Sequence, residues 1–218
     1  MTEIKWDQEG ERRFETGVDH GVLYKPDIVT GAYDEGFPWN GLISVTESPS
    51  GAEANPQYAD NMKYLNLTSA EELGGTIEAF TYPPEFGECD GSAEPVVGVS
   101  IGQQTRRSFG LAYRTKVGND LNSEAGYKLH LIYNAQAAPT ERAYTTVNDS
   151  PEALTFSWEF TTTAVDVPGF KPSAQLTIDS TKVPAPKLAM LEDILYGRDL
   201  EEPRLPKPSE VIAIFDAA

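Results

Sequence analysis

The stretch that decides the fold is residues 154–163, Leu-Thr-Phe-Ser-Trp-Glu-Phe-Thr-Thr-Thr. Leu154, Phe156, Trp158 and Phe160 alternate with polar residues. A period of two places successive side chains on opposite faces of a strand, so this stretch is predicted to be a half-buried β-strand. Residues 106–116 and 127–137 alternate in the same way, and all three exceed the about five or six residues of a typical strand. We therefore expect long strands with one apolar and one polar face, which suit a wall better than a pocket.

The composition narrows the possible functions. The chain has 218 residues, with 17 Lys and Arg against 34 Asp and Glu, a formal net charge of −17. Proteins that grip nucleic acid neutralise phosphates with Lys and Arg, so this balance argues against such a role, although it allows a surface past which DNA slides. No segment approaches the about 18 apolar residues of a membrane span, and residues 1–14 do not resemble a signal peptide. We expect no membrane insertion, and synthesis and folding in a reducing cytoplasm.

The order of elements along the chain predicts a single mainly-β domain over residues 1–218. Shorter strands are expected at 41–47, 62–67, 75–82 and 173–178. One helix is predicted at about 184–197, because Leu188, Leu191 and Leu195 recur at helical spacing and Gly197 follows as a C-cap. The remaining long segments are expected to be an N-terminal arm (1–30), a long loop (48–61) and a C-terminal arm (198–218).

The sequence contains one motif typical of a catalytic site, but the residues around the motif do not fit the enzyme class to which it belongs. Gly98-Val99-Ser100-Ile101-Gly102 matches the nucleophile elbow of α/β-hydrolases, and Asp120 and His130 follow in the required order. The residues after the motif have the periodicity of a strand where a hydrolase needs a helix. The chain has two histidines and one cysteine, Cys89, too few for the usual zinc site. We predict no catalytic, cofactor or metal-binding residues.

Basic residues gather around the strand predicted at 106–116. Arg106, Arg107, Arg114 and Lys116 could form ion pairs with another subunit, or they could cover a solvated strand face. Exposed ion pairs contribute only about 0–1 kcal/mol each, so the sequence leaves both alternatives open.

Many short blocks of the sequence resemble, in the same order, the major tail (tail tube) proteins of siphophages, notably those that infect actinobacteria. The blocks are Gly36-Phe37-Pro38-Trp39-Asn40-Gly41-Leu42, Tyr58-Ala59-Asp60-Asn61, Tyr64-Leu65, Thr76-Ile77-Glu78-Ala79-Phe80-Thr81-Tyr82-Pro83, Ile101-Gly102-Gln103-Gln104-Thr105-Arg106, Phe109-Gly110-Leu111, Tyr113-Arg114-Thr115, Gly118-Asn119-Asp120, Tyr127-Lys128-Leu129-His130 and Asn148-Asp149-Ser150-Pro151. The resemblance covers about residues 31–195, and several ordered blocks are far more specific than any one of them.

The resemblance implies a fold and an assembly. The fold is a β-sandwich or partial β-barrel with one flanking helix and long inter-subunit loops and arms. Six copies close into a ring, and rings stack into a hollow, non-contractile tail. The implied partners are other copies of the chain, the tape measure protein, the tail terminator, distal tail or baseplate proteins, and phage DNA that passes non-specifically through the lumen. The implied location is the virion tail, assembled in the bacterial host cytoplasm.

The resemblance also suggests candidate surfaces. The polar face of residues 154–163, namely Thr155, Ser157, Glu159 and Thr161, is expected to face the lumen, because an acidic or hydroxyl-rich lining repels phosphate. The expected inter-subunit contacts are Ser48, Pro49, Pro56, Tyr58, Arg106, Arg107 and Arg114.

Two other readings remain open at this point. One is the tube protein of a contractile tail or injection system. The other is a monomeric β-sandwich that binds a receptor or a carbohydrate through Trp6, Trp39 or Trp158, although the position of Trp158 on an apolar strand face predicts a core residue.

Overall fold

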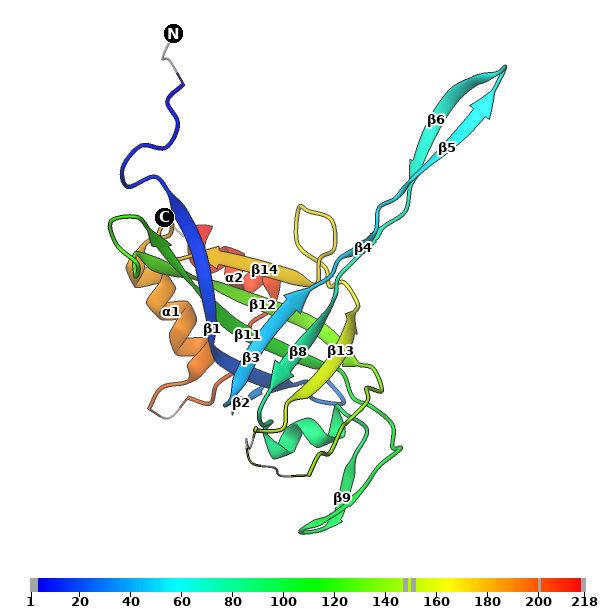
Figure 1. Ribbon diagram of the computed structural model, residues 1–218, viewed down its shortest axis with the longest axis vertical. Coiled ribbons are helices and arrows are strands. Elements are labelled where there is room, and N and C mark those ends of the chain that lie inside the picture. The colour runs from blue at the N-terminus through cyan, green and yellow to red at the C-terminus, as the bar shows by residue number, and fades with distance from the viewer. Residues whose placement is uncertain (1–3, 147–148, 150–151, 200, 217–218) are drawn as a thin grey trace.

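A computed structural model of the chain describes residues 4–146, 149, 152–199 and 201–216. An eight-stranded antiparallel sheet dominates it (Figure 1), with the order β2-β1-β11-β12-β13-β8-β3, and β14 pairs with β12 beside β13. The strands of this sheet are β1 (Arg13–Lys25), β2 (Glu35–Trp39), β3 (Leu42–Glu47), β8 (Gly74–Ala79), β11 (Phe109–Asn119), β12 (Gly126–Ala137), β13 (Phe156–Thr162) and β14 (Gln175–Asp179). The resemblance block at 148–151 lies almost wholly outside the described residues.

The three long strands expected from the alternating pattern are present as β11, β12 and β13. β11 begins three residues later than predicted and β13 two residues later. The hairpin between β11 and β12 turns at Asn119, whose side-chain oxygen accepts hydrogen bonds from the backbone N–H groups of Leu121 (3.1 Å) and Asn122 (2.7 Å). This side chain replaces backbone partners in the turn, as Asn does in Asx-turns.

The expectation of one polar face holds for β13 but is wrong for most of β11 and β12. On β13, Trp158 is buried and Glu159 is exposed. On β12, Leu131 points to one face and His130 and Ile132 to the other, yet Leu131 and Ile132 are both buried. The neighbouring positions on both faces of β11 are also mostly buried. The reason is that the sheet has a core on each side, one inside its curl and one under the helices.

The first core lies inside the curl of the sheet, which forms a partial barrel. Figure 1 shows β3, β8 and β13 lying in front of β11 and β12, and β3 also contacts β1. Aromatic rings fill the space between them: Phe86 lies 4.7 Å from Trp39 and 5.2 Å from Trp158, measured between centroids. Phe86 belongs to the 3₁₀ helix η1 (Pro84–Glu88). The sheet stays open, since β2 and β3 are its two ends. The predicted fold class is confirmed.

The second core lies under two helices. The predicted helix is confirmed as α1 (Ala185–Tyr196), with Pro184 at its N-cap, Leu188, Leu191 and Leu195 buried, and Gly197 at φ 76° after its last turn. Residues 198–218, expected as an arm, instead contain a second helix, α2 (Pro208–Asp216), which contacts α1. The segment is fastened to the body by Leu205, whose N–H donates to the Tyr33 carbonyl (3.0 Å).

The expected N-terminal arm also differs, because residues 13–25 form β1 inside the sheet, between β2 and β11. The pairing of β1 with β11 shifts register near Gly17 and again near His20, and both residues have positive φ. Such bulges interrupt the alternation of apolar and polar residues on a strand. The period of two is therefore hidden in the sequence.

The loop expected at 48–61 is one half of a long β-hairpin that projects far from the body (Figure 1). β4 (Ser50–Gly51) pairs with β7 (Glu71–Glu72), and β5 (Ala54–Ala59) pairs with β6 (Met62–Thr68). Asp60 and Asn61 form the turn with φ of 52° and 62°, the combination that a type I′ turn requires. We call residues 50–72 the long hairpin. A second one, the short hairpin, consists of β9 (Ala93–Val96) and β10 (Val99–Ile101).

Candidate assembly surfaces

The polar face of β13 continues across its neighbours β8 and β3. Residues opposite one another on antiparallel strands share a face, so the pairing defines rows of side chains. Ser157, Glu78 and Ser44 form one row, and Glu159, Thr76 and Thr46 form the next. Ser44 Oγ donates to Glu78 Oε2 at 2.9 Å. These rows contain only hydroxyl and carboxylate groups.

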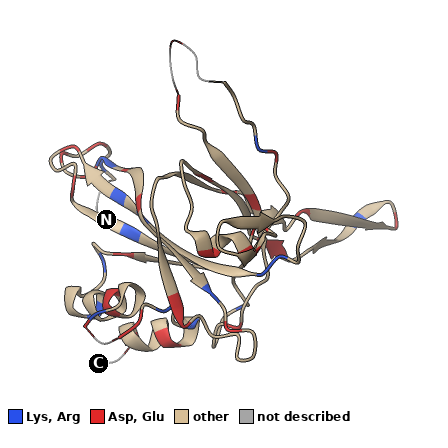
Figure 2. Cartoon of the chain, turned by 90° about the horizontal axis from the view of Figure 1, so that it is seen from below, with Lys and Arg blue, Asp and Glu red and all other residues tan. Residues whose placement is uncertain are grey.

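The structure brings the four candidate lumen residues together. Ser157, Glu159 and Thr161 lie on the polar face of β13, and Thr155 is exposed immediately before the strand. Figure 2 shows Lys and Arg spread over the described part of the chain, with no single basic patch. The rows on the polar face of β13, β8 and β3 contain no Lys or Arg to pair with phosphate groups.

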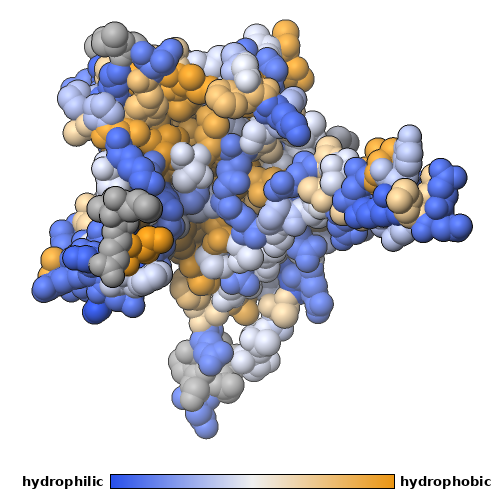
Figure 3. All heavy atoms as spheres, turned by 90° about the horizontal axis from the view of Figure 1, so that it is seen from above, coloured by the Kyte–Doolittle hydropathy of each residue, from blue (hydrophilic) through white to orange (hydrophobic). Residues whose placement is uncertain are grey.

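The long hairpin carries large apolar side chains that are exposed. Tyr58 and Tyr64 are each 71% exposed, and Met62 and Leu67 are also exposed. Figure 3 shows hydrophobic and pale residues among hydrophilic ones on this projection. Of the expected contact residues here, Pro56 and Tyr58 lie on β5, whereas Ser48 and Pro49 lie at the root of the hairpin. Several large exposed apolar side chains on one projection indicate a surface that contacts another molecule.

The root of the long hairpin is held by Glu47, which the sequence analysis did not single out. Glu47 Oε1 accepts a hydrogen bond from Tyr113 Oη (2.5 Å) and another from Gln175 Nε2 (2.6 Å). The ring of His130 stacks on that of Tyr113 with centroids 4.7 Å apart, and its Nδ1 lies 3.7 Å from Glu47 Oε1. Glu47 therefore ties the end of β3 to three strands that do not pair with β3.

His130 is shielded in this network. Its Nε2 forms a hydrogen bond of 3.0 Å with Thr115 Oγ1. Burial lowers the pKa of His130 below its usual value, although the Glu47 carboxylate opposes this shift. Burial, together with the hydrogen bond to Glu47, raises the pKa of Tyr113. At neutral pH the imidazole of His130 and the phenol of Tyr113 are therefore both neutral.

The three candidate arginines make ion pairs within the chain, an arrangement that neither alternative from the sequence included. Arg107 Nη1 lies 2.7 Å from Glu88 Oε2, and Arg106 Nη1 lies 3.6 Å from Asp90 Oδ1. Arg114 Nε lies 3.0 Å from Asp19 Oδ1, and its guanidinium covers the ring of Tyr127 at 4.6 Å. Their side chains are largely covered, so they hold the body together. They lie apart from the long hairpin, on β11 and the segment before it.

The Gly98–Gly102 motif lies on the short hairpin and not at a strand-to-helix turn. Ser100 is exposed on β10, whereas His130 lies on β12, where its ring stacks on Tyr113 and forms a hydrogen bond with Thr115 of β11. Burial raises the pKa of Cys89 to about 12, which keeps this thiol protonated at neutral pH. Among the residues that the structure describes, no three His, Cys, Asp or Glu side chains are grouped to hold a metal ion.

The short hairpin exposes the β-branched residues Val96, Val97, Val99 and Ile101. No strand was predicted from the sequence for residues 93–101, and Ser100 stood out only as part of a catalytic motif. The alternation of Val97, Val99 and Ile101 is the signal that could have identified this edge.

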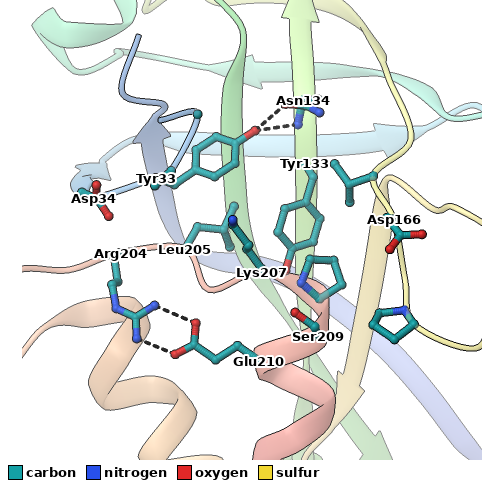
Figure 4. A pocket seen from close by; sticks show the side chains of 15 residues that line it. Tyr33, Asp34, Tyr133, Asn134, Asp166, Arg204, Leu205, Lys207, Ser209 and Glu210 are labelled. Atoms are coloured by element: carbon teal, nitrogen blue, oxygen red, sulfur yellow. Dashed lines mark hydrogen bonds and ion pairs between the residues drawn. The ribbon is translucent and has the colours of Figure 1, made fainter. Parts of the chain in front are cut away.

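A cavity of about 370 Å³ separates the C-terminal segment from the sheet (Figure 4). Tyr33 Oη donates to Asn134 Oδ1 (2.8 Å), and Arg204 forms a two-pronged ion pair with Glu210 at 2.9 and 2.5 Å. The Arg204 hydrogen bond lowers the pKa of Glu210, although burial opposes it. The first contact lies within the body and the second within the C-terminal segment, and Tyr133 Oη, which donates to the Pro206 carbonyl (2.9 Å), joins the two.

Two further observations bear on the alternative functions. Trp39 and Trp158 are buried in the first core, as predicted for Trp158, so neither can act as a platform for a sugar, whereas Trp6 is exposed. In the described part of the chain, no helix is long and apolar enough to cross a membrane.

No protein-family model and no curated protein matches the chain. It is similar to a chain in the cryo-EM structure of the anti-feeding prophage baseplate, with 9% identity and a TM-score of 0.39, over 83% of this chain and 100% of that one. It is also similar to a chain of the sheath–tube complex of an extracellular contractile injection system, PVC, with 10% identity and a TM-score of 0.34, over 73% of this chain and 88% of that one. A third similar chain belongs to the anti-feeding prophage tube-terminating cap, with 10% identity and a TM-score of 0.36, over 74% of this chain and 89% of that one. With TM-scores below 0.5, these likenesses do not support a functional assignment.

Proposed function

We propose that this chain is a structural virion protein, the major tail tube subunit of a non-contractile phage tail. Copies of it assemble into hexameric rings that stack into a hollow tube. The observation that carries the proposal is the long hairpin, which holds Tyr58, Met62, Tyr64 and Leu67 away from the body where only another molecule can cover them. The ordered sequence blocks that resemble siphophage tail tube proteins supply the identity of the assembly.

The polar face of β13, β8 and β3 is the proposed lumen lining. Its carboxylate groups repel phosphate, and its rows of side chains contain no Lys or Arg to pair with phosphate, so DNA passes without being held. The tape measure protein occupies the lumen before the DNA, and the tail terminator and distal tail or baseplate proteins close the two ends of the tail. The role is structural and not enzymatic.

Electron microscopy of the purified chain at high concentration tests the proposal. We expect rings and tubes, and a variant in which residues 54–68 are replaced by a short Gly-Ser linker should form no tubes while keeping the circular dichroism spectrum of a β-protein. A wild-type chain that remains monomeric at all concentrations would contradict the proposal. A sheath around the same tube in the native particle would identify a contractile system.

A charge reversal tests the lumen assignment. Glu159→Lys places a cation on the polar face of β13, so DNA ejection should slow while tubes still assemble. Glu35→Lys, on the exposed edge of β2, is the matched control and should eject DNA at the normal rate. A cryo-EM reconstruction that places Glu159 on the outer surface of the tube would overturn the assignment.

A further inference from the structure

The short hairpin exposes an apolar surface for which the described part of the chain offers no cover. Val97 is 95% exposed at its tip, and Val96, Val99 and Ile101 beside it are each about half exposed or more. Exposed apolar residues are normal when they are scattered, but a contiguous group on a projection marks a contact with another molecule.

The short hairpin is also fixed in place before any partner binds. At its root, Ser92 N–H donates to the Gly87 carbonyl (2.7 Å) and Gln104 N–H donates to the Gly91 carbonyl (2.9 Å). The buried Asp90 carboxylate forms ion pairs with Arg106 and Arg142. At the tip, Gly98 N–H donates to Glu94 Oε1 at 2.5 Å. A preorganised surface loses less conformational entropy on binding, which favours association.

Charge limits where two copies can touch. The chain carries −17, yet residues 95–105 contain no charged side chain, and residues 54–68 contain only Asp60 and Lys63, whose charges cancel. Like-charged molecules repel over most of their surfaces, so they associate with least opposition where both are neutral. The tips of the two hairpins are such places, and both expose apolar side chains.

The two hairpins project from opposite ends of the long axis of the molecule (Figure 1). A contact between unlike surfaces at opposite ends is heterologous, and it repeats from copy to copy as an open series when the rotation between copies does not close a ring. We propose that the short hairpin of one copy binds the long hairpin of a second copy, end to end, so that Val97 and its neighbours pack against side chains such as Tyr64. This contact deepens the proposed function and rests on it, because it would join one ring to the next.

A mixing experiment tests the contact. Val97→Asp alters only the short hairpin and Tyr64→Asp only the long hairpin, and both side chains are mostly exposed, so both variants should fold. Because each buries an unpaired charge in the contact, each should weaken end-to-end association at least about tenfold, measured by sedimentation. An equimolar mixture should form pairs that contain one copy of each variant, because the intact short hairpin of Tyr64→Asp can bind the intact long hairpin of Val97→Asp. Longer polymers should not form, since the other two hairpins of each pair carry the substitutions. Val29→Asp, at a position 91% exposed on a loop, is the control and should assemble as wild type does.

The outcomes separate this inference from the proposed function. A wild-type chain that forms neither rings nor tubes contradicts the proposed function. Wild-type tubes together with normal stacking of Val97→Asp overturn the end-to-end contact alone. Loss of single rings in Val97→Asp also overturns it, since the short hairpin would then act within a ring. Circular dichroism spectra that match wild type show that any loss reflects the contact and not misfolding.

Discussion

At the residue scale, Glu47 joins strands that are distant in the sheet. Its carboxylate is the common acceptor for Tyr113 and Gln175, and it faces the ring of His130. The side chain comes last in β3, so these bonds fix the point from which the long hairpin leaves the body. No local pattern in the sequence indicates this role, because the partners meet only when the sheet curls.

His130 should make the stability of the fold depend on pH. Its pKa lies below its usual value of about 6.5 because burial disfavours the charged form, while Glu47 and Glu15 oppose the shift and Lys128 adds to it. The folded state therefore binds fewer protons than the unfolded state below pH 6.5, and its stability is complete above that pH and falls below it. Each unit of pKa difference corresponds to about 1.4 kcal/mol.

Urea unfolding of wild type and of His130→Gln at pH 7.5 and pH 5.5 measures this effect. We expect wild type to lose more free energy of unfolding between the two pH values than His130→Gln does. The comparison cancels the contribution of the carboxylates, which titrate in both proteins. Equal losses would show that the folded and unfolded states hold the His130 proton equally well.

At the element scale, the long hairpin depends on Gly51 at its root. Gly51 has φ of 85°, and a Cβ there would lie 2.3 Å from the carbonyl oxygen of Ala70 on the opposite strand. Gly51→Ala should therefore break the pairing of β4 with β7 and loosen the hairpin. The body should keep its free energy of unfolding within about 0.5 kcal/mol, because the hairpin contributes nothing to either core.

Hydrogen exchange read by mass spectrometry checks this expectation. The amides of residues 50–72 should lose protection in Gly51→Ala, and those of β11 and β12 should not. Gly169→Ala is the control, since Gly169 also has positive φ (80°) but a Cβ there meets no atom within 4 Å. A cooperative loss of protection across the whole sheet would contradict the independence of the hairpin.

The elements that the sequence predicts well are those whose period is unbroken. β12, β13 and α1 repeat their patterns over two or more turns or pleats, so only their ends were displaced. β1 was missed because bulges shift its register, and α2 because nine residues give a helical period little room. The first half of the long hairpin was expected to be a loop because its Pro, Gly and Asn residues are typical of turns, whereas its second strand, predicted at 62–67, is confirmed as β6. The candidate polar face followed from β13 alone, whereas its extension across β8 and β3 required the strand order.

At the scale of the whole molecule, net charge opposes the assembly that the exposed hairpins favour. Raising the salt concentration from about 0.01 M to about 0.1 M shortens the Debye length from about 30 Å to about 10 Å. Repulsion between copies that each carry −17 should then weaken, while apolar contacts persist. We expect light scattering at fixed protein concentration to rise with salt. A fall would show that ion pairs between copies outweigh the repulsion.

The pairing of β1 with β11 sets the order in which the chain can fold. Arg13 pairs with Asn119, so β1 cannot complete its pairing with β11 until more than half of the chain has been synthesised. The long hairpin needs only its own residues, and hairpins of this kind form in about 1–10 μs. The surface proposed to bind another copy can therefore form, at least transiently, before the body that positions it. During synthesis the strong negative charge keeps nascent chains apart, which protects an early-folding apolar projection from premature aggregation.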